Sequence, residues 1–291
     1  MKYNKYLILG GDLRSLHLYD ILQKEGNKVK ISGFSEYKNE QKPVIQNILE
    51  LEKALENTEI VIGPIPCCGN GDNLNAPFNS KYISVEDVLE HMNEDQIFIA
   101  GRISWNIIEK AKSRNIKIFD ILERDEMAIL NAIPTAEGAI QIAMEKMKIV
   151  LHGSNALVLG YGNIGKILAK MLHGIGTNVH ITCRKYSDAA LIRSYGYESL
   201  SYGQLADNLN KMDVIFNTVP SLVLDKGNLR YINEDCVIIE LASKPFGIDQ
   251  QECRKEGLTI TWAPSLPGKV APVTAADYIR ETICNIVNEM E

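Results

Sequence analysis

The stretch that decides the fold is NALVLGYGNIGKILAKMLHGIGTNVHITCR, residues 155–184. It begins with a short apolar run, continues with a glycine-rich turn and an amphipathic segment, and ends in a second apolar run. Strand, turn, helix and strand in this order open a βαβ unit. The G-x-G-x-x-G spacing over residues 160–165 is weak by itself, but in this setting it predicts a dinucleotide-binding turn.

Each glycine of this turn has a physical task. Gly160 permits the tight turn, Gly162 lets a pyrophosphate approach the backbone, and Gly165 lets the helix lie close to the strand. The start of the helix adds free N–H groups and the positive end of the helix dipole. We therefore expect a dinucleotide to contact Gly160, Gly162, Asn163, Ile164 and Gly165.

A similar stretch occurs earlier in the chain. Residues 5–34, KYLILGGDLRSLHLYDILQKEGNKVKISGF, align without a gap with residues 155–184 at an offset of 150. Asp12 and Ser15 stand where the later turn has Gly162 and Gly165. Asp12 would bring a side chain and a negative charge to the phosphate position. We expect this half to keep the fold without binding a dinucleotide, and we assign the substrate to it.

Both halves continue as apolar runs that alternate with helical stretches; the runs are residues 58–66, 97–103 and 116–122, then 213–220, 235–243 and 258–264. Such alternation is typical of parallel sheets covered on both faces. The predicted fold class is α/β, with two Rossmann-like, doubly wound parallel-sheet domains and an interdomain cleft.

The predicted domain limits follow from this alternation. Residues 1–133 form the substrate domain, which is flavodoxin- or Rossmann-like, and residues 134–273 form the dinucleotide-binding domain. Thr135 is expected to cap the helix that connects them. The last helix, residues 274–291, has no strand after it and is expected to pack back on the first domain.

Composition excludes several classes of protein. The 291 residues are 45% hydrophobic and carry a net charge of −6 without a long basic run, which argues against nucleic-acid binding. No apolar run reaches the roughly 18–20 residues of a membrane-spanning helix. The six cysteines show no CxxC or Cys/His spacing typical of zinc, so we expect reduced thiols and no metal.

The choice of dinucleotide rests on VHITCRK, residues 179–185. NAD-binding units usually place an acidic residue at this strand end, where it bonds the adenosine ribose. Arg184 and Lys185 stand there instead. Two cations fit the extra 2′-phosphate of NADP. Later strand ends are expected to border the nicotinamide, with Thr218, Pro220, Ser221, Ala242 and Ser243.

Two domains of this kind also occur in D-2-hydroxy-acid dehydrogenases, which use a histidine base late in the cofactor domain. The histidines of this chain are residues 17, 91, 152, 173 and 180. The late stretch WAPSLPGKVAP, residues 262–272, contains none. This function is therefore kept as an alternative that lacks its base.

Several motifs together resemble one family. They are LGGDLR (9–14), ERDEMAILNAIPTAEGAI (123–140), the glycine turn, LASKPFGID (241–249) and APSLPGKVAPVTAADYI (263–279). The chain is similar over nearly its whole length to the family of dipicolinate synthase A-type subunits. The stretch 36–57 and the loop 67–80 carry none of these motifs.

The resemblance implies an NADP-dependent oxidoreductase subunit of a sporulating bacterium, in the cytoplasm of the mother cell. It implies that the partner is the flavoprotein-like B-type subunit of dipicolinate synthase. The implied reaction converts dihydrodipicolinate, or 4-hydroxy-tetrahydrodipicolinate from the lysine pathway, to dipicolinate. A non-catalytic NADP-binding accessory subunit is the alternative. Homo-oligomer formation is left open.

A dicarboxylate substrate calls for cations at strand ends and turns; in order of preference they are Arg14, Arg124, Lys269 and Arg102. Lys269 is expected in a rigid loop over residues 265–272. Proton removal needs a group such as a carboxylate, and the candidates near the domain crossover are Glu123, Asp125 and Glu137. Asn131 and Thr135 could donate hydrogen bonds to the substrate. The sequence does not identify the base among these residues.

Overall fold

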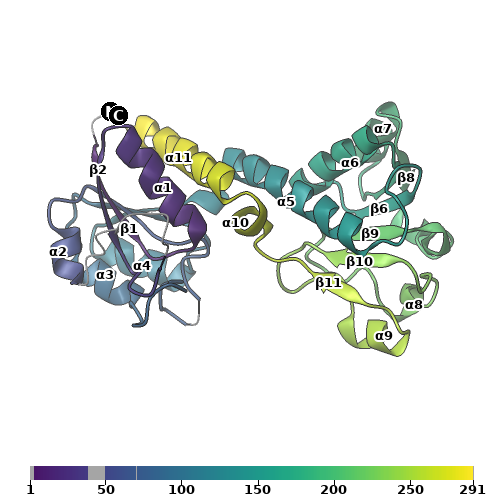
Figure 1. Ribbon diagram of the computed structural model, residues 1–291, viewed down its shortest axis with the longest axis horizontal. Helices are drawn as coiled ribbons and strands as arrows, with labels where there is room; N and C mark the ends of the chain where they lie inside the picture. Colours follow the sequence, from purple (N-terminus) through teal and green to yellow (C-terminus); the bar gives the residue numbers. More distant parts are fainter. Residues whose placement is uncertain (1–2, 39–49, 70, 291) are drawn as a thin grey trace. The chain divides into compact units, whose positions relative to one another are not determined.

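The computed structural model describes residues 3–38, 50–69 and 71–290 (Figure 1). The chain divides into two compact units, Met1–Leu130 together with Ala271–Glu291, and Asn131–Val270. The division falls within the long helix α5 (Asp125–Lys146). Within the described residues no helix is both long and apolar enough to cross a membrane.

The first unit contains a five-stranded parallel sheet in the order β2-β1-β3-β4-β5. The strands are β1 (Lys5–Leu9), β2 (Lys28–Ser32), β3 (Ile60–Ile62), β4 (Ile97–Ala100) and β5 (Lys117–Asp120), followed by the 3₁₀ turn η1 (Ile121–Glu123). This is the order of flavodoxin-like sheets, whose strand order reverses between the first and third strands. Ligands of such sheets bind beyond the carboxyl ends of the strands at that point.

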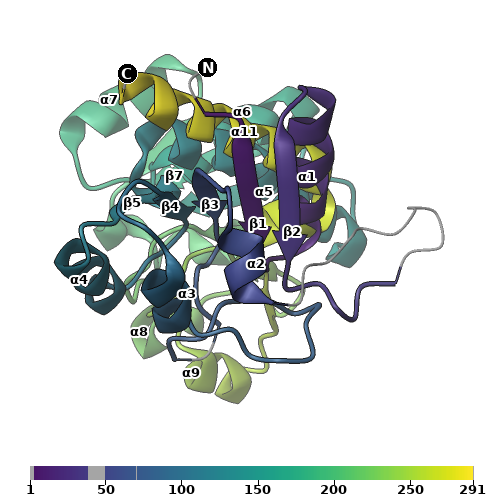
Figure 2. The same cartoon turned by 90° about the vertical axis from the view of Figure 1, so that its left-hand side faces the viewer.

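Alternate residues of β1 face opposite sides of this sheet. Tyr6 and Ile8 pack against α1 (Leu13–Lys24) and α11 (Pro272–Glu289). Leu7 and Leu9 belong to the opposite layer, with α2 (Leu51–Leu55), α3 (Val85–His91) and α4 (Trp105–Ser113). Helices α1 and α11 lie side by side in both views (Figures 1 and 2). The last helix of the chain is therefore part of the first unit.

The second unit contains a six-stranded parallel sheet in the order β11-β10-β9-β6-β7-β8. Its strands are β6 (Asn155–Leu159), β7 (Asn178–Thr182), β8 (Glu198–Leu200), β9 (Val214–Asn217), β10 (Val237–Glu240) and β11 (Ile260–Trp262). This order is that of the dinucleotide-binding Rossmann sheet, which reverses between β6 and β9. The prediction of two Rossmann-like parallel-sheet domains is confirmed.

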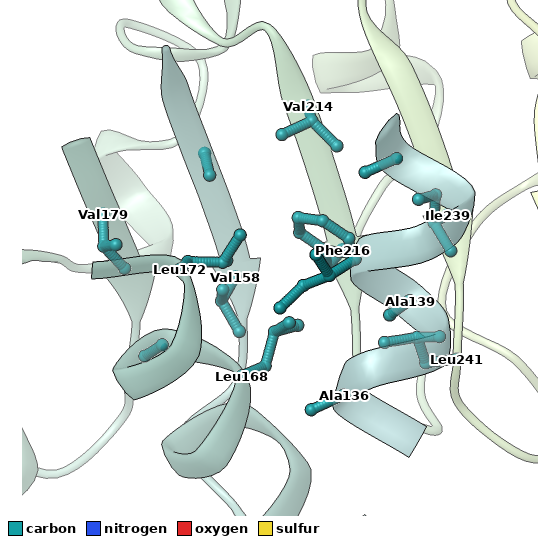
Figure 3. Packing of buried hydrophobic residues seen from close by; sticks show 14 of the residues in the cluster. Ala136, Ala139, Val158, Leu168, Leu172, Val179, Val214, Phe216, Ile239 and Leu241 are labelled. Atoms are coloured by element: carbon teal, nitrogen blue, oxygen red, sulfur yellow. The ribbon is translucent and has the colours of Figure 1, made fainter. Parts of the chain in front are cut away.

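Helices and 3₁₀ turns cover both faces of the second sheet; they are α6 (Asn163–Ile175), α7 (Tyr186–Ser194), η2 (Tyr202–Gln204), η3 (Leu209–Lys211), α8 (Lys226–Leu229), α9 (Gln250–Lys255) and α10 (Leu266–Val270). The core on one face centres on Phe216 of β9, which is fully buried. Figure 3 shows Phe216 beside Val158 and Leu168, with Ala136 and Ala139 of α5 next to it. Small residues on α5 let this helix approach the sheet closely.

Two local predictions are wrong. Thr135 does not cap a helix, because α5 begins at Asp125 and continues through Pro134. Thr135 lies inside it, and its hydroxyl donates to the Asn131 carbonyl one turn earlier, at 2.7 Å. Residues 266–270 form the short helix α10 rather than a loop. Pro267 is compatible with a helix there because the first turn needs no backbone N–H from it.

Candidate dinucleotide-binding site

The turn after β6 is built so that only glycine fits at two positions. Gly160 has φ +95°, and a Cβ there would lie 2.7 Å from Val219 Cγ2. A Cβ on Gly165 would lie 2.2 Å from the Gly160 carbonyl oxygen. The backbone of α6 thus passes directly against the end of β6, as the close-packing role of the third glycine requires.

Gly162 has the opposite surroundings. A Cβ at this position would meet no atom within 4 Å. Gly162 is the N-cap of α6 and has no side chain to cap the helix, and none of the described side chains bonds the N–H groups of its first turn. These N–H groups and the positive helix end favour an anion. The residues present therefore fit a pyrophosphate at this turn.

The matching turn of the first unit is closed by its own side chains. Asp12 caps α1 and accepts a hydrogen bond from the Arg14 backbone N–H at 3.0 Å. The Arg14 guanidinium donates to the two oxygens of Asp12 at 2.9 and 2.8 Å and to the Ile65 carbonyl at 2.6 Å. The Asp12 carboxylate thus stands where an anionic ligand would meet the helix.

The end of β7 lies beside the glycine turn. Leu159 pairs with Thr182, and the Thr182 hydroxyl accepts a hydrogen bond from the Gly160 N–H at 3.0 Å. Arg184 and Lys185 follow directly and are exposed. Neither forms an ion pair with a residue in the described part of the chain. Their charges are therefore available to an anion at the outer end of this site.

The strand ends expected to border the nicotinamide differ among themselves. The Thr218 hydroxyl donates to the Leu159 carbonyl at 2.7 Å, so it already holds the glycine turn. Pro220, Ser221 and Ser243 are exposed. Ala242 borders a cavity of about 400 Å³ beyond the carboxyl ends of β10 and β11, which is lined by Glu240, Ala242, Pro245, Phe246, Ile248, Gln250, Trp262, Ala263 and Pro264.

This cavity has an aromatic wall. The rings of Phe246 and Trp262 meet edge to face with centroids 4.6 Å apart. Such a wall suits a flat ring. The sequence prediction did not include Phe246, Trp262 or Glu240. The signal available in the sequence was Glu240, a carboxylate at the end of the otherwise apolar strand VIIE.

The cations expected to bind the substrate fall into two groups. Arg14 is 5% exposed and is paired with Asp12. Arg124 is bound on both sides, to Glu289 at 2.7 and 2.5 Å and to Glu126 at 2.8 Å. The carboxylates of Glu289 and Glu126 hold the pKa of Arg124 above its usual range. Arg124 therefore fastens α11 to the first unit.

Arg102 and Lys269 form the other group. Arg102 lies just beyond the carboxyl end of β4, and Lys269 lies on α10. Both are exposed, and neither makes an ion pair with any described residue. These two cations are free to meet a carboxylate.

The residues expected to move protons or hold the substrate ring remain predictions. Glu123, Asp125 and Glu137 are exposed and form no ion pair within the described residues. No contact singles out one of them as the base. The side-chain oxygen of Asn131 is buried and has no hydrogen-bond partner in the described part of the chain, whereas the Thr135 hydroxyl donates within its own helix.

Comparison with known proteins agrees with this description. Residues 5–122 match the model of the N-terminal domain of the dipicolinate synthase A-type subunit. Residues 133–242 match the NAD-binding domain of D-isomer specific 2-hydroxyacid dehydrogenases, so the second unit is a nicotinamide-dinucleotide domain of the dehydrogenase type. The D-lactate dehydrogenase of Escherichia coli, at 15% identity and a TM-score of 0.62, shares the fold.

Whole-length relatives are similar in both sequence and structure. The A-type subunit of dipicolinate synthase from Bacillus subtilis is 28% identical over 99% of this chain and 97% of its own. The crystal structure of the corresponding polypeptide from Bacillus halodurans has a TM-score of 0.86 at 27% identity and covers 98% of both chains. The resemblance seen in the sequence is therefore confirmed: the chain is similar throughout to the A-type subunit of dipicolinate synthase, and residues 5–122 match the model of the N-terminal domain of that subunit.

Proposed function

We propose that this chain is an NADP-dependent oxidoreductase subunit that forms dipicolinate from dihydrodipicolinate or from its 4-hydroxy-tetrahydro precursor. The observation that carries the proposal is the open, uncapped start of α6 beside two exposed cations without ion-pair partners among the described residues. Dipicolinate is the product that the name of the relatives specifies.

The end of β7 supports NADP over NAD. A carboxylate at this place would repel a 2′-phosphate, whereas a guanidinium can form paired charge-assisted hydrogen bonds with it. Each such bond contributes roughly 1.5–3 kcal/mol. Arg184 and Lys185 together would favour NADP by about two to four decades, at ~1.4 kcal/mol per decade.

The rest of the chain supplies positioning. NADP⁺, when bound, would supply the hydride acceptor for a two-electron oxidation in which the ring of dihydrodipicolinate also loses one proton. The 4-hydroxy-tetrahydro precursor would in addition lose its hydroxyl group as water. Arg102 in the first unit and Lys269 in the second are exposed cations without an ion-pair partner among the described residues, and each is proposed as a contact for a substrate carboxylate. The aromatic wall of Phe246 and Trp262 is suited to a flat ring. Because the product is aromatic, the main task of the protein is to orient the ring and take up the proton.

The coenzyme assignment is tested with Arg184→Ala. The variant should bind NADPH roughly 10- to 100-fold more weakly, because it loses charge-assisted bonds to the 2′-phosphate, and should bind NADH almost as before. Isothermal titration calorimetry measures both affinities. Arg254→Ala removes an exposed arginine from α9 of the same unit and serves as control. Equal weakening for the two coenzymes would refute the assignment.

The reaction is tested separately from coenzyme binding. Stopped-flow absorbance follows NADP⁺ reduction by the isolated chain with freshly prepared substrate. Reduction without the B-type partner supports the oxidoreductase. Tight NADP binding with no reduction until that partner is added supports an accessory role. Reduction by a simple 2-hydroxy acid would favour the dehydrogenase alternative, whose cofactor domain this chain shares.

A further inference from the structure

Glu240 is a carboxylate buried at the carboxyl end of β10. It is 2% exposed and lies among the residues that line the aromatic cavity. Burial raises the pKa of this carboxyl group, although the hydrogen bonds that it accepts act in the opposite direction. Burying a carboxylate is unfavourable unless each oxygen is bonded, so its contacts indicate what it is there to hold.

The described groups that bond Glu240 are all donors, and three of them have measured distances. Oε1 accepts from the Asn217 side-chain amide at 2.7 Å and from the Ala242 N–H at 3.0 Å. Oε2 accepts from the Gly247 N–H at 3.0 Å. Because N–H groups surround the side chain of residue 240, both of its terminal atoms must be hydrogen-bond acceptors, as in a carboxylate. A glutamine at this position would have one acceptor oxygen and one NH2 group. Its NH2 group would face the N–H donors that now bond the second carboxylate oxygen.

These bonds join two loops that follow neighbouring strands. Residues 218–224 follow β9, and residues 241–248 follow β10. Asn217 bonds both Val219 and Glu240, and the Gly247 carbonyl accepts from the N–H groups of Val223 and Leu224 at 2.8 and 3.0 Å. A Cβ on Gly247 would lie 2.4 Å from the Asn217 amide nitrogen. The two loops therefore form one tightly packed unit around the carboxylate.

We propose that Glu240 is a positioning residue that fixes these two loops in the arrangement required by the nicotinamide half of the coenzyme. The inference rests on the proposed function, because the loops contain Thr218, Pro220, Ser221, Ala242 and Ser243. The adenosine 2′-phosphate depends on Arg184 and Lys185 after β7, which are not among the described hydrogen-bond partners of Glu240.

The test compares Glu240→Gln with the wild type on two ligands. NADPH uses both halves of the site, whereas 2′,5′-ADP uses only the adenosine half. The variant should bind NADPH ~10- to 100-fold more weakly, while its affinity for 2′,5′-ADP changes less than ~2-fold. Calorimetry measures both affinities, and thermal melting records stability. Thr177→Val loses a buried hydroxyl bond elsewhere in the same unit, next to the start of β7, and controls for a general loss of stability.

Each outcome decides the inference. Selective loss of NADPH affinity supports it, and equal loss for both ligands, or no loss, overturns it. Wild-type protein that binds neither ligand overturns the proposed function together with this inference. If Glu240→Gln does not fold, Glu240→Asp gives the same comparison, because it keeps the charge but is too short to bond both loops.

Discussion

The two strand-to-helix turns of this chain follow the same pattern of apolar strand, glycine turn and helix, but only one of them leaves its helix start open to an anion. In the first unit Asp12 caps α1 and binds Arg14, so the helix start is already provided with a carboxylate. In the second unit Gly162 leaves the start of α6 uncapped and open. One residue therefore decides whether the helix dipole is satisfied by the chain itself or by a ligand.

The difference extends to the neighbouring cations. Arg14 lies against the first turn and forms an ion pair with Asp12. Arg184 and Lys185, beside the second turn, form no ion pair with a described residue. In the first turn, the Asp12 carboxylate that caps the helix also neutralises the neighbouring Arg14. The first unit thus keeps the packing of a nucleotide-binding turn while closing its anion site.

The variant Gly162→Asp tests this difference most directly, because it places in the second turn the aspartate that the first turn has at residue 12. We expect coenzyme affinity to fall by about three decades, because a carboxylate ~4 Å from the pyrophosphate costs about 4 kcal/mol at an effective dielectric constant of ~20. Folding should be preserved, since a side chain there meets open space and aspartate is a good N-cap. Calorimetric titration and a thermal melt measure the two effects.

The control is Gly162→Ala, which adds a Cβ without a charge. A Gly162→Asp variant that still binds NADPH like this control would show that the pyrophosphate does not lie at the turn.

The reverse change, Asp12→Ala, opens the first turn. It removes the cap of α1 and leaves the Arg14 guanidinium, whose side chain is 7% exposed, without its carboxylate. We expect the free energy of unfolding to fall by about 3 kcal/mol, because a buried charge is left unpaired. Chemical denaturation followed by circular dichroism checks this.

Asp277→Ala provides the comparison for a more exposed pair. The side chain of its partner Arg280 is 28% exposed, so the loss should stay below about 1 kcal/mol. Equal losses for the two variants would mean that the Asp12–Arg14 pair does not hold the first turn.

The smallest effect concerns the strand that follows each helix. His180 of β7 matches Lys30 of β2 at the same offset of 150 residues. Burial lowers the pKa of His180, the nearby Lys211 lowers it further, and the facing Glu198 acts in the opposite direction. Lys30 instead donates to carbonyls at the end of α2, including that of Lys53 at 3.0 Å.

Because the folded pKa of His180 is lowered, the unfolded chain binds a proton more readily as the pH falls through about 6.5. The free energy of unfolding therefore falls as the pH drops below about 6.5, because protonation of His180 favours the unfolded chain. This loss is complete once the pH lies below the pKa of His180 in the folded protein. His180→Gln should lose less stability than the wild type between about pH 7.5 and about pH 5.5, measured as urea midpoints. Parallel losses would exclude His180 as the source.

Sequence reasoning succeeded where the determinants are local. The two sheets follow from apolar runs and glycine spacing, and the tasks of Gly160 and Gly165 follow from the distance between strand and helix. The predicted cap at Thr135 was wrong because the helix begins ten residues earlier, at Asp125, and continues through Pro134.

Pairing over long distances could not be read from the sequence. The main partner of Arg124 is Glu289, 165 residues further along, and no motif near Arg124 indicates it. Asp12 lies two residues from Arg14, but its bond to the guanidinium depends on the side-chain geometry at the turn. Glu240 was visible as a charge in an apolar strand, whereas its role depends on two loops that meet only after folding.

The place of α11 has a consequence for synthesis on the ribosome. The hydrophobic core of the first unit includes Ile279, Ile283 and Ile286 from the end of the chain, and Arg124 bonds Glu289. All the residues of the second unit, 131–270, precede α11 in the chain. The second unit is therefore translated in full before α11, whereas the core of the first unit can be completed only after α11 has been synthesised.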